Sequence, residues 1–146
     1  QKNMYISLKE AHNIMGMAIL FLLLFAIIAI LIVFLRKKPF GKFSKVVSLI
    51  GLIIIHLQIN IGIALYFLSP LGKSNFSGES MKHTISRFYI IEHPIGMILA
   101  AVLITIGYRR SKNTTRTNAN RHLQILLFYG ISLAIITYLI PWFLWN

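Results

Sequence analysis

A chain of 146 residues that is 57% hydrophobic and only 12% charged cannot bury its apolar side chains in one soluble domain, so lipid must cover many of them. The absence of cysteine excludes disulfides, iron–sulfur clusters and thiolate zinc sites. The formal charge of +12 does not indicate a nucleic-acid binder, because the basic residues lie in short gaps between apolar runs rather than along one face.

Four apolar runs, taken in chain order, are each about as long as a helix that crosses a membrane. They cover residues 14–35, 46–68, 88–107 and 123–145. None contains Lys or Arg, and their continuity excludes the apolar–polar alternation of a membrane barrel. The first run is too long for a signal-peptide core and has no small-residue cleavage site after it, so we expect it to remain as a helix. The sequence thus predicts one all-α transmembrane domain over residues 1–146, an up-down four-helix bundle.

The basic residues predict the orientation of these spans. The connection 36–45 carries five Lys or Arg residues and no acidic one, and the stretch 109–121 carries five more, again without an acid. Because cytoplasmic loops are enriched in Lys and Arg, we expect these two connections in the cytoplasm. Both chain ends would then lie on the periplasmic side of a bacterial inner membrane.

Each predicted helix carries one histidine in the span or at its edge, and ionisable residues at membrane depth are candidate functional residues. His12 and His93 fall in the outer leaflet, His56 near the middle, and His122 at the cytoplasmic edge. The fifth histidine, His83, falls in the outer loop, where we expect a plain surface residue.

Histidines on separate helices of a membrane bundle suit the iron of a haem, which takes an imidazole nitrogen on each face. Two ligand pairs remain open, His12 with His93 or His93 with His56, and His93 belongs to both. His122 could pair only with His56 around a second haem, or serve another role. The iron ligands predicted here are therefore His93, His56 and His12, with His122 as a further candidate.

The predicted outer boundary also carries cations that could bind the haem propionates. These are Lys82 and Arg87, together with Lys73. Glu92, next to His93 in the sequence, is expected to neutralise Arg87 or to take part in proton transfer.

Several motifs resemble a family of small four-helix membrane proteins of Bacteroidetes that is labelled "cytochrome B". The resemblance covers nearly the whole chain, and its most specific parts are HLQINIGIALYFLSP at residues 56–70 and EHPIGM at residues 92–97. Further matching positions are His12, the Lys37-Lys38-Pro39-Phe40 turn, IGYRRSK at residues 106–112, Arg121-His122 and Ile140-Pro141-Trp142. The resemblance implies haem b and a Gram-negative inner membrane.

These observations favour a haem b protein that transfers electrons as a subunit or partner of a larger respiratory or redox complex, rather than a self-contained enzyme. Two alternatives stay open. Copper(I) or another metal could bind where His12 has Met15 on its face and His93 has Met97, since thioether and imidazole suit soft metals. Alternatively, the chain could be an accessory subunit without cofactor, whose histidines only bind neighbouring helices.

Overall fold

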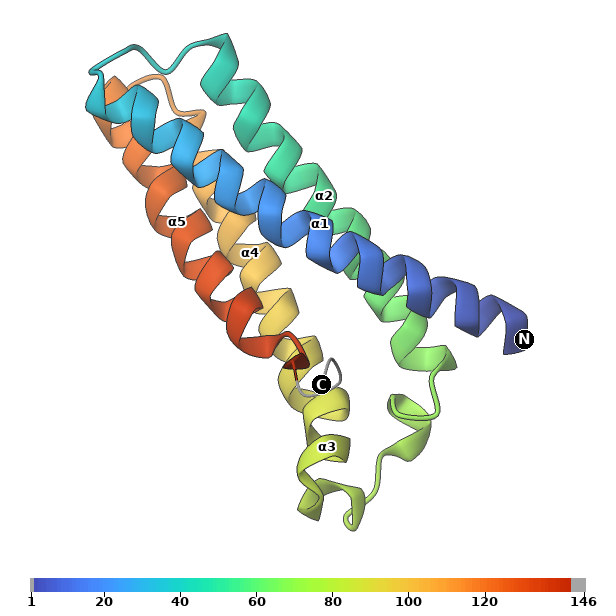
Figure 1. Cartoon of the computed structure of the whole chain (residues 1–146). Coiled ribbons are helices and arrows are strands. Elements are labelled where there is room, and N and C mark those ends of the chain that lie inside the picture. The colour runs from blue at the N-terminus through green and yellow to red at the C-terminus, as the bar shows by residue number, and fades with distance from the viewer. Residues whose placement is uncertain (1, 143–146) are drawn as a thin grey trace.

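Four long helices make up most of the molecule in a computed structural model that describes residues 2–142 (Figure 1). Shorter helical turns lie between the second and fourth helices, and no strand occurs among residues 2–142. The long helices are α1 (Lys2–Leu35), α2 (Lys42–Leu68), α4 (His93–Ser111) and α5 (Asn118–Leu139). The short ones are η1 (Lys73–Asn75), η2 (Ser80–Lys82), α3 (Thr84–Arg87) and η3 (Phe88–Glu92). The prediction of an all-α bundle is confirmed.

The long helices form an up-down bundle in which each packs against two others. α1 lies against α2 and α5, and α4 completes the ring between α2 and α5. α1 and α4 are therefore diagonal partners, as are α2 and α5. Figure 1 shows the connections 36–41 and 112–117 at one end, and the beginning of α1, the loop 69–83 and the end of α5 at the other. Toward this second end α1 and α2 diverge from α4.

Each of these helices, with α3 and η3 continuing into α4 as one span, is long and apolar enough to cross a membrane. At most a third of the most apolar stretch in each span is buried inside the bundle. Large side chains such as Phe21, Phe25 and Ile14 are more than half exposed on the outside. Lipid must therefore cover these faces, as the composition predicted.

The helices do not begin and end where hydrophobicity alone placed the spans. α1 begins at Lys2 rather than at residue 14, because a polar helix can continue beyond the lipid. α5 ends at Leu139, whereas the predicted span continued to residue 145; residues 143–145 lie outside the described part of the chain. Pro141 explains this end, since the residue before a proline avoids helical backbone and Ile140 is extended (φ −69°, ψ 131°).

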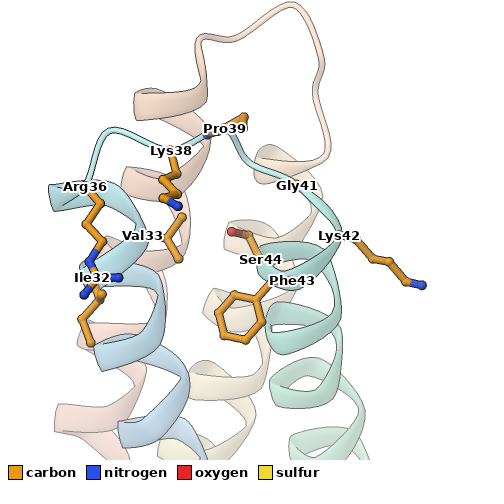
Figure 2. A pocket seen from close by; sticks show the side chains of 9 residues that line it. All are labelled: Ile32, Val33, Arg36, Lys38, Pro39, Gly41, Lys42, Phe43 and Ser44. Atoms are coloured by element: carbon orange, nitrogen blue, oxygen red, sulfur yellow. The ribbon is translucent and has the colours of Figure 1, made fainter.

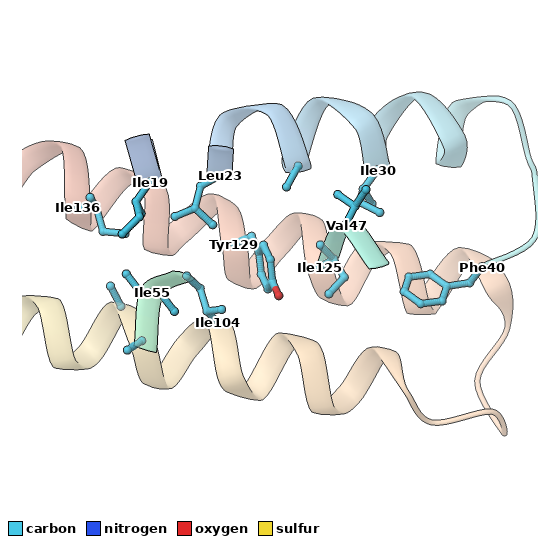
Figure 3. Close-up of a cluster of buried hydrophobic side chains, with 13 residues drawn as sticks. Ile19, Leu23, Ile30, Phe40, Val47, Ile55, Ile104, Ile125, Tyr129 and Ile136 are labelled. Carbon is cyan, nitrogen blue, oxygen red and sulfur yellow. The ribbon is translucent and has the colours of Figure 1, made fainter. Parts of the chain in front are cut away.

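The core runs along the bundle axis as a column of fully buried apolar side chains (Figure 3). Two buried polar side chains beside it bond to backbone carbonyls of neighbouring helices: the Tyr129 hydroxyl donates to Ser48 O at 2.6 Å, and the Ser132 hydroxyl donates to Ala100 O at 3.0 Å. Such bonds tie α5 to α2 and to α4, as expected where lipid offers no alternative partner. The central members of the column are Leu23, Ile30, Ile55, Ile104, Ile125 and Tyr129.

The closest approach of α4 to α5 depends on Gly107. A Cβ placed there would lie 2.6 Å from Phe128 Cβ and 3.1 Å from the Gln124 carbonyl oxygen, so the helices would have to separate. We expect Gly107→Ala to lower the free energy of unfolding by about 1–3 kcal/mol, the usual cost of overpacking. Unfolding in mixed micelles, followed by circular dichroism, measures the change. Gly130→Ala is the matched control, because a Cβ at Gly130 meets nothing within 4 Å and alanine favours the helix. Equal stability of the two variants would contradict this prediction.

Candidate functional site

Two of the four helix histidines face one another across the bundle. His12 on α1 and His93 at the start of α4 have ring centres 6.2 Å apart, with ring planes at 71°. Both side chains are half-buried. Because α1 and α4 are diagonal partners, the two imidazoles meet between the helices, in the half of the bundle that holds the beginning of α1 and the loop 69–83.

A backbone carbonyl fixes the orientation and the tautomer of His93. Its Nδ1 lies 2.9 Å from Leu139 O. A carbonyl oxygen can only accept, so Nδ1 carries the proton and donates, which leaves the Nε2 lone pair free to bind a metal. Leu139 can offer this carbonyl because Pro141 ends α5, and the last carbonyls of a helix have no partner within it.

The backbone turn before His93 is wider than an α-helical one. Residues Phe88–Glu92 form a π-helical turn, in which the N–H of His93 bonds to Phe88 O. Pro94 explains the irregularity, since it lacks the N–H that would bond to Ile90 O in a regular helix. The turn also places the Phe88 ring against His93, with ring centres 5.7 Å apart. Such π-helical turns occur frequently at functional sites.

Two contacts with α2 hold His12 in place, one at its backbone carbonyl and one at its ring. Gln58 Nε2 donates to the His12 carbonyl oxygen at 2.7 Å, and Gly16 leaves room for that amide. A Cβ at Gly62 would lie 3.2 Å from His12 Cε1, so the ring packs directly on the α2 backbone. His12 Nδ1 is buried without a hydrogen-bond partner, as is Gln58 Oε1. Both atoms are therefore open to a partner that the described part of the chain does not supply.

The predicted propionate-binding cations lie in the loop 69–83 and the helical turns after it, and two of them already have acidic partners. Arg87 Nε lies 2.7 Å from Glu92 Oε1, the neutralising pair expected from the sequence. Lys82 Nζ lies 2.9 Å from Glu79 Oε2. Both pairs are well exposed, so they exchange partners at little cost.

Lys73 and His83, the other polar residues considered in this loop, lie on its surface. The Lys73 amine is 5.1 Å from the ring centre of Phe67, beside a pocket lined also by Tyr66 and Phe76. His83 is exposed, and its Nε2 is 3.6 Å from Glu79 Oε1.

His56 does not join the pair. Its side chain is exposed on the outside of the bundle, where Nδ1 donates to Leu52 O at 2.8 Å and Nε2 lies 3.4 Å from Thr105 Oγ1 on α4. Of the two ligand pairs left open by the sequence, only His12 with His93 has the two rings in contact.

His122 lies at the opposite end of the bundle and is fully buried there. Its Nε2 is 3.3 Å from Ser44 Oγ, and the Phe40 ring centre is 4.9 Å from its own. The neighbouring Arg121 stacks on the same Phe40 ring, 4.5 Å from its centre, and donates from Nε to Ser111 O. These contacts join the two connections at this end, which is a structural role for His122.

The Leu139 carbonyl and the π-helical turn were not found by sequence reasoning. Pro141 and Pro94 produce these two features, because the first ends α5 at Leu139 and the second lacks the N–H that would bond to Ile90 O. Gln58 and Gly62 lie within the motif at residues 56–70, but their contacts with His12 could not be predicted from it.

His12 and His93 are the two residues whose imidazoles could hold a haem iron. One imidazole has a fixed tautomer with a free Nε2, and the other has a buried nitrogen without a partner. Among residues 2–142 no group of three or more His, Cys, Asp or Glu side chains could hold a metal, so an ion that needs three protein ligands does not suit this site.

Comparison with known proteins finds no matching family, no matching curated protein and no matching solved structure.

Proposed function

We propose that this chain is a haem b-binding membrane protein that transfers electrons, with His12 and His93 as the two iron ligands. The observation that carries the proposal is the pairing of these imidazoles on diagonal helices, with ring centres 6.2 Å apart. His12 and His93 would hold the iron, one imidazole from each of two helices that lie diagonally across the bundle. The resemblance to the small four-helix cytochrome family points the same way.

The residues around the pair would set the properties of the bound group. Haem b, when bound, supplies one-electron chemistry by cycling between ferric and ferrous iron. The hydrogen bond from His93 Nδ1 to Leu139 O would hold the ring in the orientation and tautomer that leave Nε2 free for the iron. Phe88 packs on His93 and would cover one side of its ring. Arg87 and Lys82 would exchange their present carboxylate partners for the propionates.

We further propose that the protein lies in a bacterial inner membrane with its basic connections in the cytoplasm and works beside other membrane subunits of a redox complex. The charge of residues 36–45 and 109–121 supports the orientation. Asn60 supports a partner, because its polar side chain is exposed on a face of α2 that would otherwise meet lipid. Polar side chains at that depth are costly in hydrocarbon and commonly bind a neighbouring helix.

An optical spectrum of the purified protein tests the proposed cofactor. We expect a reduced-minus-oxidised difference spectrum with a sharp α-band of the b type, at about one haem per chain if a single bis-imidazole site is filled. Purification from haem-supplied cells, followed by pyridine haemochrome and metal analysis, gives the ratio. Absence of the band would refute the proposal. Bound copper without haem would then favour metal handling, and neither would favour an accessory subunit.

A further inference from the structure

A groove of about 380 Å³ opens at the end of the bundle opposite the His12–His93 pair, between the end of α1 and the start of α2. Its inner wall is apolar and its rim is cationic, and Figure 2 shows both kinds of side chain around it. The apolar residues are Ile32, Val33 and Phe43, and the cations are Arg36, Lys38 and Lys42.

The end of α1 turns the chain back over this groove. Lys37 has a left-handed backbone (φ 53°). Two hydrogen bonds of the Schellman type end the helix: Lys37 N donates to Phe34 O at 2.9 Å, and Lys38 N donates to Val33 O at 3.2 Å. Lys38 is thereby placed above the last turn of α1. In Figure 2 its side chain extends toward Val33, beside the apolar wall.

The cations of the groove have no acidic partner among residues 2–142. Its three acidic residues are Glu10, Glu79 and Glu92, which all belong to the other end of the bundle. The first turn of α2 adds positive potential, since Gly41 at its N-cap offers no side-chain hydrogen bond and no acid lies in that turn. An anion from outside the chain is therefore the complementary partner for this rim.

We propose that the groove binds one anionic phospholipid. Lys38, Arg36 and the start of α2 take the phosphate, while the acyl chains lie along Ile32, Val33 and Phe43. A lipid of this class combines the two chemistries of the groove, and the groove lies at the end of a membrane span, where headgroups meet hydrocarbon. A zwitterionic lipid brings its own cation to the rim, and a soluble anion makes no use of the apolar wall. This inference does not depend on the proposed haem.

Tryptophan quenching tests the proposal in the full-length protein. Phe43, which is 55% exposed, is replaced by tryptophan in a background carrying Trp142→Phe and Trp145→Phe, so that one tryptophan reports on the groove. The chain is reconstituted in vesicles that contain phosphatidylglycerol or phosphatidylcholine with brominated acyl chains. We expect preferential quenching by phosphatidylglycerol, and Lys38→Gln should lower the relative binding constant about fivefold, the effect of one cation near a lipid phosphate.

Lys45→Gln is the matched control, because it removes one charge from the same turn of α2 outside the groove and should leave the preference unchanged. Circular dichroism verifies that each variant keeps its helices. Equal quenching by the two lipids, or an equal loss in Lys38→Gln and Lys45→Gln, would overturn the proposal. Inorganic phosphate is added in a second arm. If it abolishes the preference at constant ionic strength, the site binds free anions and the assignment to a lipid is wrong.

Discussion

Replacing His93 with alanine is expected to abolish haem binding. In the proposed site the imidazole of His93 would supply one iron ligand, and no third His, Asp or Glu among residues 2–142 joins the pair in a group that could hold a metal. Its Nδ1 also bonds to the Leu139 carbonyl, so the substitution removes the group that orients the site as well as the ligand. Purified His93→Ala should show less than a tenth of the wild-type b-type absorbance per chain, an effect of more than about 1.4 kcal/mol on binding.

Two alanine variants serve as controls for His93→Ala. His83→Ala and His56→Ala should keep the wild-type spectrum, since His83 is exposed in the loop 69–83 and His56 is exposed and bonds to Leu52 and Thr105 instead of the pair. Imidazole added to His93→Ala should restore part of the absorbance, which separates loss of a ligand from loss of the fold. An unchanged spectrum in His93→Ala would disprove the ligand assignment. Loss of haem in His56→Ala would favour the other pair.

The four spans could be predicted because lipid imposes a length and a composition on every crossing helix. The same argument could not give the helix ends. α1 continues to Lys2 through polar residues that hydrophobicity excludes, and α5 stops at Leu139 within an apolar run that hydrophobicity accepts. A helix end is decided by single residues such as Pro141, so it follows from local backbone rules rather than from the average of a span.

The site could be predicted only in part, because height along a helix follows from sequence but rotation around it does not. The sequence analysis predicted His12 and His93 in the outer leaflet and His56 near the middle of the membrane, and two ligand pairs remained open. Packing distinguishes them: the ring of His93 faces His12, whereas that of His56 points outward and bonds within its own helix to Leu52. The tautomer of His93 depends on Leu139, 46 residues away, and no local pattern encodes that contact.

The presence of a histidine in a membrane helix also does not show whether its role is structural or functional. His122 is more deeply buried than His12 or His93, yet its nitrogen bonds to Ser44 and its ring packs on Phe40. Burial shows only that a polar group must have a partner. The partner is a protein hydroxyl for His122, whereas His12 Nδ1 has none.

The position of His12 leads to the second large effect, which is expected at Gly62. A Cβ at this residue lies 3.2 Å from His12 Cε1, so alanine requires the ring to shift by a few tenths of an ångström and leucine requires it to leave its place. The backbone of His12 cannot move away to relieve this contact, because the side-chain amide of Gln58 donates to the His12 carbonyl oxygen and itself lies against Gly16. Gly62→Leu should therefore lose most of its haem, and Gly62→Ala should keep most of it. The haem-to-protein ratio measures both.

Gly130→Leu is the control for a bulky residue in place of a helix glycine, because a Cβ there meets nothing within 4 Å. It should retain its haem. Gly62→Leu should also unfold more easily by about 1–3 kcal/mol if the α1–α2 contact must open, as for other overpacked interfaces. Comparing the loss of haem with the loss of stability distinguishes two roles of Gly62, which are seating the His12 ring and packing α2 against α1. Loss of stability with full haem content would mean that Gly62 serves only helix packing and that iron does not bind at His12. Loss of haem in a stable bundle would show that the glycine is there to seat the ring.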